Sequence, residues 1–144
     1  MEAADVAASG DASFALIGGE AGIGKSRLVM ETAARLRAND WLVLEGGAVP
    51  LGDDGLPFGP IAEALRTLVR SVDADRIAAA AGPSLADLAR LVPELSKTTD
   101  EAPHADDAGW LQVRIFEGVR RLLGRLGAST PVALVIEDLH WADR

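Results

Sequence analysis

Apolar and polar positions along the chain follow two alternating patterns. Short apolar runs occupy residues 14–17, 41–44 and 132–136, and each ends at glycine or acidic residues, as buried strands commonly do. Elsewhere apolar residues recur at helical spacing, which predicts helices at about 25–38, 61–72, 75–81, 84–92 and 110–126. Strands that alternate with helices predict an α/β fold, with a parallel sheet flanked by helices.

Local signals refine these elements. Gly46-Gly47 is expected to close the second strand, and Pro60 suits the start of the helix that follows. Ser84 is a candidate N-cap, with Asp87 at the spacing of a capping box. A helical insert at about 58–127 therefore separates the second strand from the third.

The third predicted strand contains no polar residue. Residues 132–136 are continuously apolar, which predicts a strand buried on both faces. Right-handed crossovers place the C-terminal ends of parallel strands at one edge of the sheet, and ligands of such sheets bind at that edge. The residues that follow each strand are therefore the first candidates for function.

The first strand runs directly into a phosphate-binding motif. Residues 19–26 read Gly-Glu-Ala-Gly-Ile-Gly-Lys-Ser and fit G-x-x-x-x-G-K-[ST], the P-loop or Walker A motif. The glycines let backbone N–H groups converge on phosphate oxygens, and the following helix adds its positive N-terminal end. We expect Lys25 to contact the β- and γ-phosphates of ATP and Ser26 to bind Mg²⁺. The expected cofactor-binding residues are Gly19, Glu20, Ala21, Gly22, Ile23, Gly24, Lys25, Ser26 and Arg27.

A second acidic motif ends the third strand, at residues 132–138. Glu137 and Asp138 are candidate metal ligands together with Ser26, and candidate catalytic residues together with Lys25. One carboxylate would hold Mg²⁺ through water and the other would orient the attacking water. Strand alternation points them to different sides, and which one serves the metal stays open.

Two further residues near the motifs have competing interpretations. Glu20 is better explained as a solvent-facing loop residue than as a catalytic one. His140 is explained either by local packing, beside Trp141 and Asp143, or by sensing of the γ-phosphate.

Composition narrows the classes of partner. The net charge is −8 and no basic recognition helix is visible, so we expect no direct DNA binding and no membrane binding by this segment. The arginines of the last predicted helix are interpreted as its solvated face; they are Arg114, Arg120, Arg121 and Arg125. Without cysteine there is no thiol chemistry, and without a signal or a long apolar run we expect a cytoplasmic protein.

Both motifs together resemble a known family. Residues 19–28 and 136–143 resemble the AAA-type ATPase domain of large ATP-binding LuxR-family transcriptional regulators, which are STAND-like signalling ATPases. Residues 56–60 are similar to an aromatic-Gly-Pro segment of that domain, and residues 113–126 to its helix before the second motif. The resemblance implies ATP and Mg²⁺ as ligands and nucleotide-controlled signalling as the function.

The chain also departs from that family. Relatives begin with a Val-Gly-Arg segment and continue into further strands, sensor residues and a DNA-binding helix-turn-helix. Their sheet places a later strand between the P-loop strand and the carboxylate strand. We therefore expect residues 1–144 to be a partial, apparently truncated P-loop NTPase domain, with a gap between its half-sites or a direct pairing of 14–17 with 132–136.

Three functions fit these observations. In the first, the chain would be the Mg-ATP-binding part of a bacterial signalling or transcriptional regulator, with ATP as a conformational switch. Alternatively it belongs to a P-loop ATPase that turns over ATP for mechanical or transfer work, or it is a fragment without independent activity. We expect the isolated chain to be an inefficient ATPase, because it contains no identifiable arginine finger or sensor. Self-association stays undetermined.

Overall fold

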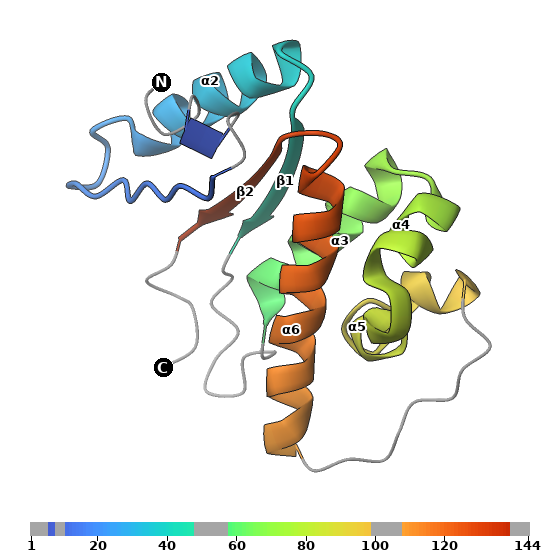
Figure 1. Cartoon of the computed structure of the whole chain (residues 1–144). Helices are drawn as coiled ribbons and strands as arrows, with labels where there is room; N and C mark the ends of the chain where they lie inside the picture. The colour runs from blue at the N-terminus through green and yellow to red at the C-terminus, as the bar shows by residue number, and fades with distance from the viewer. Residues whose placement is uncertain (1–5, 8–10, 48–57, 99–107, 139–144) are drawn as a thin grey trace.

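A computed structural model describes residues 6–7, 11–47, 58–98 and 108–138 (Figure 1). The expected helices all form, with ends within a few residues of those predicted. The elements are, in chain order, α2 (Lys25–Ala38), β1 (Leu42–Gly47), α3 (Gly59–Ser71), α4 (Ala74–Ala81), the 3₁₀ turn η2 (Gly82–Ser84), α5 (Leu85–Leu91), the 3₁₀ helix η3 (Pro93–Thr98), α6 (Ala108–Gly127) and β2 (Val132–Glu137).

The sheet of the described residues consists of two parallel strands. β1 pairs with β2 in a register that runs from Leu42 opposite Val132 to Gly47 opposite Glu137. Both strands therefore end at the same edge of the sheet, as the α/β pattern predicts. The mixed arrangement of helices around parallel strands confirms the α/β class in this part of the chain.

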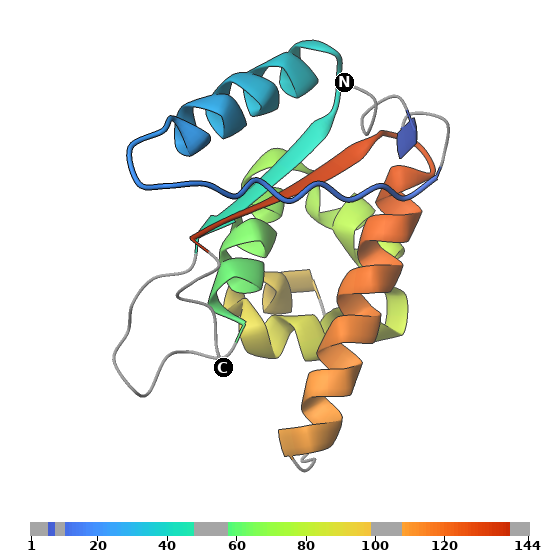
Figure 2. The same cartoon turned by 90° about the vertical axis from the view of Figure 1, so that its left-hand side faces the viewer.

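Helices cover the two faces of the sheet unequally. Helices α3, α4, α5 and α6 lie together on one side of the strands, and α2 lies on the other (Figures 1 and 2). The core fills the space between the strands and the four-helix layer. Its largest fully buried side chains are Leu44, Leu65, Leu68, Ile77, Leu88, Val92, Leu122 and Leu126. None of the helices in the described ranges combines the length and the apolar character needed to cross a membrane.

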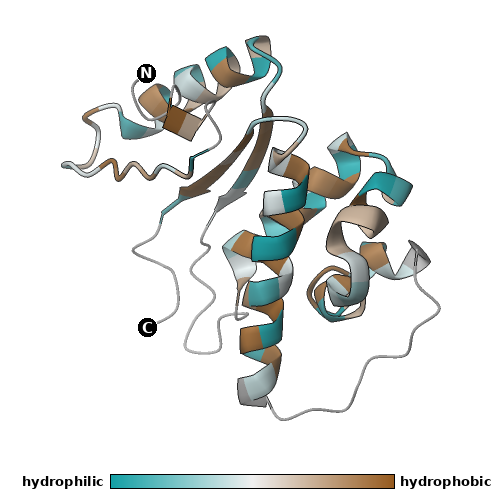
Figure 3. Cartoon of the chain, in the orientation of Figure 1, coloured by the Kyte–Doolittle hydropathy of each residue, from teal (hydrophilic) through white to brown (hydrophobic). Residues whose placement is uncertain are grey.

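The first predicted strand does not form. Residues 14–17 have no regular secondary structure, and the side chain of Phe14 is 85% exposed. Figure 2 shows this segment as an extended trace before α2, and Figure 3 shows its apolar character. A lone strand leaves its N–H and C=O groups without partners, so an extended segment with no neighbouring strand keeps them in water instead. The alternative pairing of residues 14–17 with β2 is also absent from the described part.

The prediction that residues 132–136 are buried on both faces is also wrong. Leu134 is 40% exposed and the rest of β2 is half-buried. The four-helix layer covers only one face of the strand, whereas the described residues on the other side belong to α2 and the exposed segment before it. The apolar run therefore predicts the strand correctly, but it does not predict how many faces of the strand are covered.

Strand β1 continues through the glycine pair that was expected to end it. A Cβ atom on Gly46 would lie 1.9 Å from the carbonyl oxygen of Pro60 and 2.9 Å from its carbonyl carbon. The first turn of α3 thus packs directly on the backbone of β1, at a distance that only glycine permits. Glycine is required here by a close approach between two backbones, and not by a turn.

The predicted capping box at α5 is wrong as well. Ser84 has helical torsion angles and makes no side-chain cap hydrogen bond, because η2 joins α4 to α5 without an extended residue between them. Asp87 is instead buried and accepts from Arg114 of α6, with Oδ1–Nη2 at 2.8 Å and Oδ2–Nε at 3.0 Å. This two-point ion pair fastens α5 to α6.

The arginines of α6 are only partly a solvated face. Arg120 donates to the exposed Glu117 at 2.8 Å, a contact that lowers the pKa of the Glu117 carboxyl. Arg125, by contrast, donates to the carbonyl oxygen of Ala79 in α4 at 3.0 Å. With Arg114 bound to Asp87, two of the four arginines hold helices together, which local periodicity did not predict.

The contact of Gly46 with Pro60 generates a test of packing. We expect Gly46→Ala to lower the free energy of unfolding by about 2–3 kcal/mol, because an overpacked site must push α3 away from the sheet. Gly124→Ala is the matched control. Its Cβ would meet nothing within 4 Å, and alanine in a helix is favoured over glycine by about 0.5–1 kcal/mol. Urea unfolding measures both; equal stabilities of the two variants would contradict the close approach.

The pair of Asp87 and Arg114 gives a second test. Removing Arg114 leaves a buried carboxylate without its partner, so Arg114→Met should cost about 2–3 kcal/mol in urea unfolding. The double variant Asp87→Leu with Arg114→Met should recover most of that loss, because no buried charge remains. A double variant less stable than Arg114→Met would show that the ion pair is not the reason for the loss.

Candidate functional site

The backbone of the predicted phosphate-binding loop has the torsion angles that its glycines allow. Gly19, Gly22 and Gly24 have φ values of 153°, 81° and 99°. A Cβ on Gly22 or Gly24 would meet nothing within 4 Å, so the torsion angle and not the available space requires glycine there. Gly24, in the left-handed region, is the N-cap of α2, and the loop thereby passes directly into the helix.

The N-terminus of α2 is open to an anion. No side chain caps it and no acidic residue lies in its first turn. The first intrahelical hydrogen bond that closes on the loop is donated by Leu28 to the carbonyl of Gly24, at 3.0 Å. The N–H groups before it are the ones that a helix leaves without internal partners, and they carry the positive end of its dipole. Anions bind readily at such an end.

Lys25 lies across the loop. Its Nζ donates to the carbonyl oxygens of Gly19 at 2.9 Å and Glu20 at 2.8 Å, and the residue is half-buried. An ammonium has three donors, so two N–H groups hold the loop and one stays available for a further acceptor. The sequence predicted a lysine aimed at phosphates but not that the same lysine shapes the loop.

Other residues of the motif lie at the surface. Ser26 is exposed in the first turn of α2, and the exposure of Glu20 agrees with its interpretation as a solvent-facing residue. Arg27 pairs with Glu31 one turn later at 2.9 Å, and its side chain is 82% exposed. The structure therefore ties Arg27 to its own helix and not to the loop.

The two acidic residues differ in their backbone. Glu137 is the last residue of β2, half-buried and opposite Gly47. Asp138 is exposed and lies outside the strand, with a left-handed φ of 55°. Strand alternation therefore applies to Glu137 but not to Asp138. A left-handed conformation is rare for residues other than glycine, although aspartate and asparagine tolerate it best.

The loop and the acidic residues lie at the same side of the molecule but do not join. Figures 1 and 2 both show the loop before α2 at the side where β1 and β2 end. Within the ranges that the structure describes, no group of three acidic or histidine residues is placed to hold a metal ion, and Ser26 is not bonded to Glu137 or Asp138. The predicted His140, Trp141 and Asp143 lie outside the described residues.

One further residue at this edge has no signal in the sequence. Glu63 of α3 accepts a hydrogen bond from the N–H of Gly47 at 2.7 Å, at the strand position opposite Glu137. A glutamate on a helical surface has no local signal that separates it from any solvated acid. Only the packing of α3 on β1 reveals this contact.

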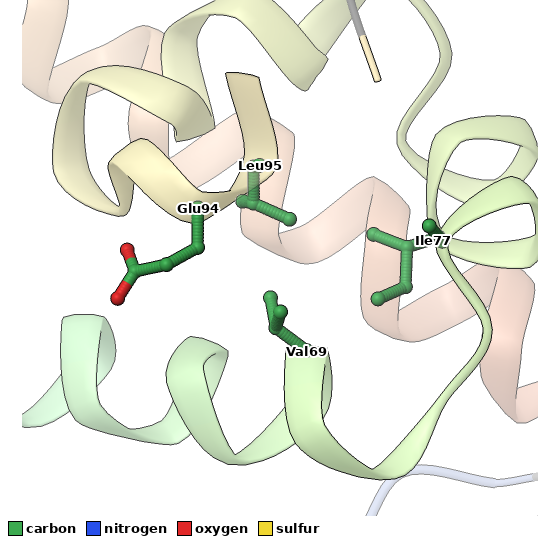
Figure 4. Close-up of a pocket in the computed structure, with 5 residues that line it drawn as sticks. Val69, Ile77, Glu94 and Leu95 are labelled. Atoms are coloured by element: carbon green, nitrogen blue, oxygen red, sulfur yellow. The ribbon is translucent and has the colours of Figure 1, made fainter. Parts of the chain in front are cut away.

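A small cavity lies elsewhere, between α3, α4 and η3. It has a volume of about 30 Å³, room for about one water molecule, and is lined by Val69, Ala74, Ile77, Glu94 and Leu95. Val69, Ile77 and Leu95 converge on it, whereas the carboxylate of Glu94 points away (Figure 4). The cavity is too small and too apolar to hold a nucleotide, so it belongs to the packing of the helical layer.

A glycine loop that enters an uncapped helix beside parallel strands is typical of nucleotide-binding α/β proteins. The comparison with protein families agrees, because the family model described as the AAA ATPase domain matches residues 1–144, the full length of the sequence. The chain belongs to the AAA ATPase domain family, and this membership implies nucleotide binding. No curated protein and no solved structure matches the chain.

The left-handed conformation of Asp138 gives a test of this site. We expect Asp138→Gly to raise the free energy of unfolding by about 0.5–1 kcal/mol, because glycine has no Cβ penalty at positive φ. Asp138→Asn should be nearly neutral and Asp138→Ala should lower stability. Urea unfolding of the three variants gives the ranking; alanine as stable as glycine would show that the residue is not left-handed in solution.

Proposed function

We propose that this chain binds Mg-ATP through residues 19–26 as the nucleotide-binding part of a signalling ATPase. The observation that supports the proposal most directly is the backbone geometry of this loop and the position of Lys25 across it. Lys25 spans it with two hydrogen bonds, its glycines have left-handed or similarly restricted torsion angles, and α2 begins without a cap.

The residues present fit a phosphate chain. The first turn of α2 has N–H groups without partners in the helix, and no side-chain cap or carboxylate of that turn competes for them. Lys25 adds a cation with one unused donor at the centre of the same loop. Charged donors bind phosphate oxygens more strongly than neutral ones, so Lys25 contributes the largest single share of the affinity.

The residues also fit Mg²⁺ that arrives with the nucleotide. This ion takes few protein ligands and keeps several waters and phosphate oxygens. Ser26 offers its hydroxyl beside the loop, and Glu137 with Asp138 offers carboxylates at the strand ends. When bound, the ion would neutralise charge on the phosphates.

We propose that ATP acts here as a conformational switch, as in the LuxR-family regulators that the sequence resembles. The segment before α2 and most of α2 itself are exposed, with Ala33 as the single buried residue of that helix. Elements with few buried contacts change their order most readily when a ligand binds. The alternatives remain an ATPase with steady turnover and a fragment without activity of its own.

The proposal depends on Lys25. We expect Lys25→Ala to weaken Mg-ATP binding by at least about tenfold, because a charge-assisted hydrogen bond contributes about 1.5–3 kcal/mol. Isothermal titration calorimetry of the 144-residue chain measures this affinity. Arg35→Ala is the matched control, since it removes an exposed cation of the same helix, in its last turn and away from the loop.

An unchanged affinity of Lys25→Ala would refute the phosphate-binding role of residues 19–26. A loss of equal size in Arg35→Ala would mean that general charge, and not the loop geometry, holds the nucleotide.

A further inference from the structure

Helix α3 holds the C-terminal end of β1 through three backbone contacts. Glu63 Oε2 accepts from the N–H of Gly47 at 2.7 Å, and Thr67 Oγ1 donates to the carbonyl of Glu45 at 3.3 Å. Gly46 lies between Glu45 and Gly47 in β1, and because it has no side chain, the carbonyl oxygen of Pro60 packs directly on the strand backbone there. No other described helix contacts a strand in this way at the edge where the candidate site lies.

The two hydrogen bonds join one face of α3 to one edge of β1. Glu63 and Thr67 are four residues apart, so they lie on one face of α3, and Glu45 and Gly47 are two residues apart, so their backbone groups point to one edge of β1. Glu63 and Thr67 therefore bind the two backbone groups of β1 that would otherwise pair with a further strand. The edge of β1 is closed there by a helix.

The hydrogen bond of Glu63 is formed with Gly47, which lies opposite Glu137, a candidate metal ligand. Gly47 and Glu137 are partners in the parallel register, and neighbouring strands lie about 4.8 Å apart. Because the two strands are paired, a displacement of the last residues of β1 would also displace Glu137. The bond is also the stronger kind, because its acceptor is a carboxylate and the distance is short.

We propose that Glu63 is a positioning residue of the nucleotide site. It acts through Gly47 to hold Glu137 where the metal-nucleotide complex needs a carboxylate, and it does not itself contact phosphate or metal. This role rests on the proposed function. Partners that orient metal-binding groups typically change metal affinity by about 10–100-fold when they are removed.

The test separates metal-dependent binding from overall stability. ATP affinity of the 144-residue chain is measured by calorimetry with Mg²⁺ and with EDTA, and the ratio of the two dissociation constants is the readout. We expect Glu63→Ala to reduce the gain from Mg²⁺ by about tenfold while the affinity in EDTA stays unchanged. Glu63→Gln should retain most of the gain, because its amide oxygen still accepts from Gly47.

Two further variants control for charge and folding. Glu63→Asp keeps the charge but shortens the side chain by one methylene, so it should behave like Glu63→Ala. Glu94→Ala removes another exposed glutamate that pairs with α3, through Arg66 at 3.6 Å, and should change neither affinity. If Glu63→Ala does not fold, the comparison of Glu63→Asp with Glu63→Gln carries the same test.

The outcomes distinguish this inference from the proposed function. If the wild-type chain does not bind ATP, or if Lys25→Ala binds it equally well, the proposed function fails and the role of Glu63 fails with it. If the wild-type chain binds ATP and Glu63→Ala keeps the full gain from Mg²⁺, only the role of Glu63 is refuted. An equal loss with Mg²⁺ and with EDTA would likewise refute it, because the residue would then be merely structural.

Discussion

The contact between the backbone of β1 and the first turn of α3 is the constraint on which the described structure depends. Gly46 lets the Pro60 carbonyl approach the strand to a distance that excludes any side chain. That approach brings Leu65 and Leu68 of α3 against the same core as Leu44 of β1. Because interiors are densely packed, the other helices must then arrange themselves around this fixed pair of elements.

The remaining helices are joined to this pair by polar contacts as well as by apolar packing. Arg76 of α4 donates to Ser129 at 2.8 Å and to Thr130 at 3.0 Å, in the turn that leads into β2. The Asp87–Arg114 pair fixes α5 to α6. Such directed contacts add little net stability individually, but they select one arrangement of helices whose apolar faces alone would permit several.

The candidate nucleotide site has the opposite character. Residues 11–24 are exposed throughout, and α2 has Ala33 as its single buried residue and an ion pair of Arg37 with Glu45 of β1 at 2.6 Å. A loop that leads into an uncapped helix is suited to binding an anion, because the first N–H groups of a helix have no partner within it. The acidic candidates lie elsewhere, with Glu137 half-buried at the end of β2 and Asp138 exposed just after it.

The sequence by itself determined the features that depend on neighbours in the chain. Helix positions follow from the spacing of apolar residues, and the torsion angles of the loop follow from Gly22 and Gly24. The two motifs also identified the AAA ATPase domain family. Each of these is local, since a helical turn or a glycine torsion is set by residues only a few positions away.

Only the tertiary structure decided the features that need a distant partner. Residues 14–17 have the composition of a strand but no neighbouring strand to satisfy their backbone, so they stay extended in water. Asp87 has the spacing of a cap but lies beside Arg114, and Glu63 resembles a solvated acid until α3 packs on β1. Hydrogen bonds between segments far apart in sequence leave no local pattern, and they are what separates a surface residue from a structural or positioning one.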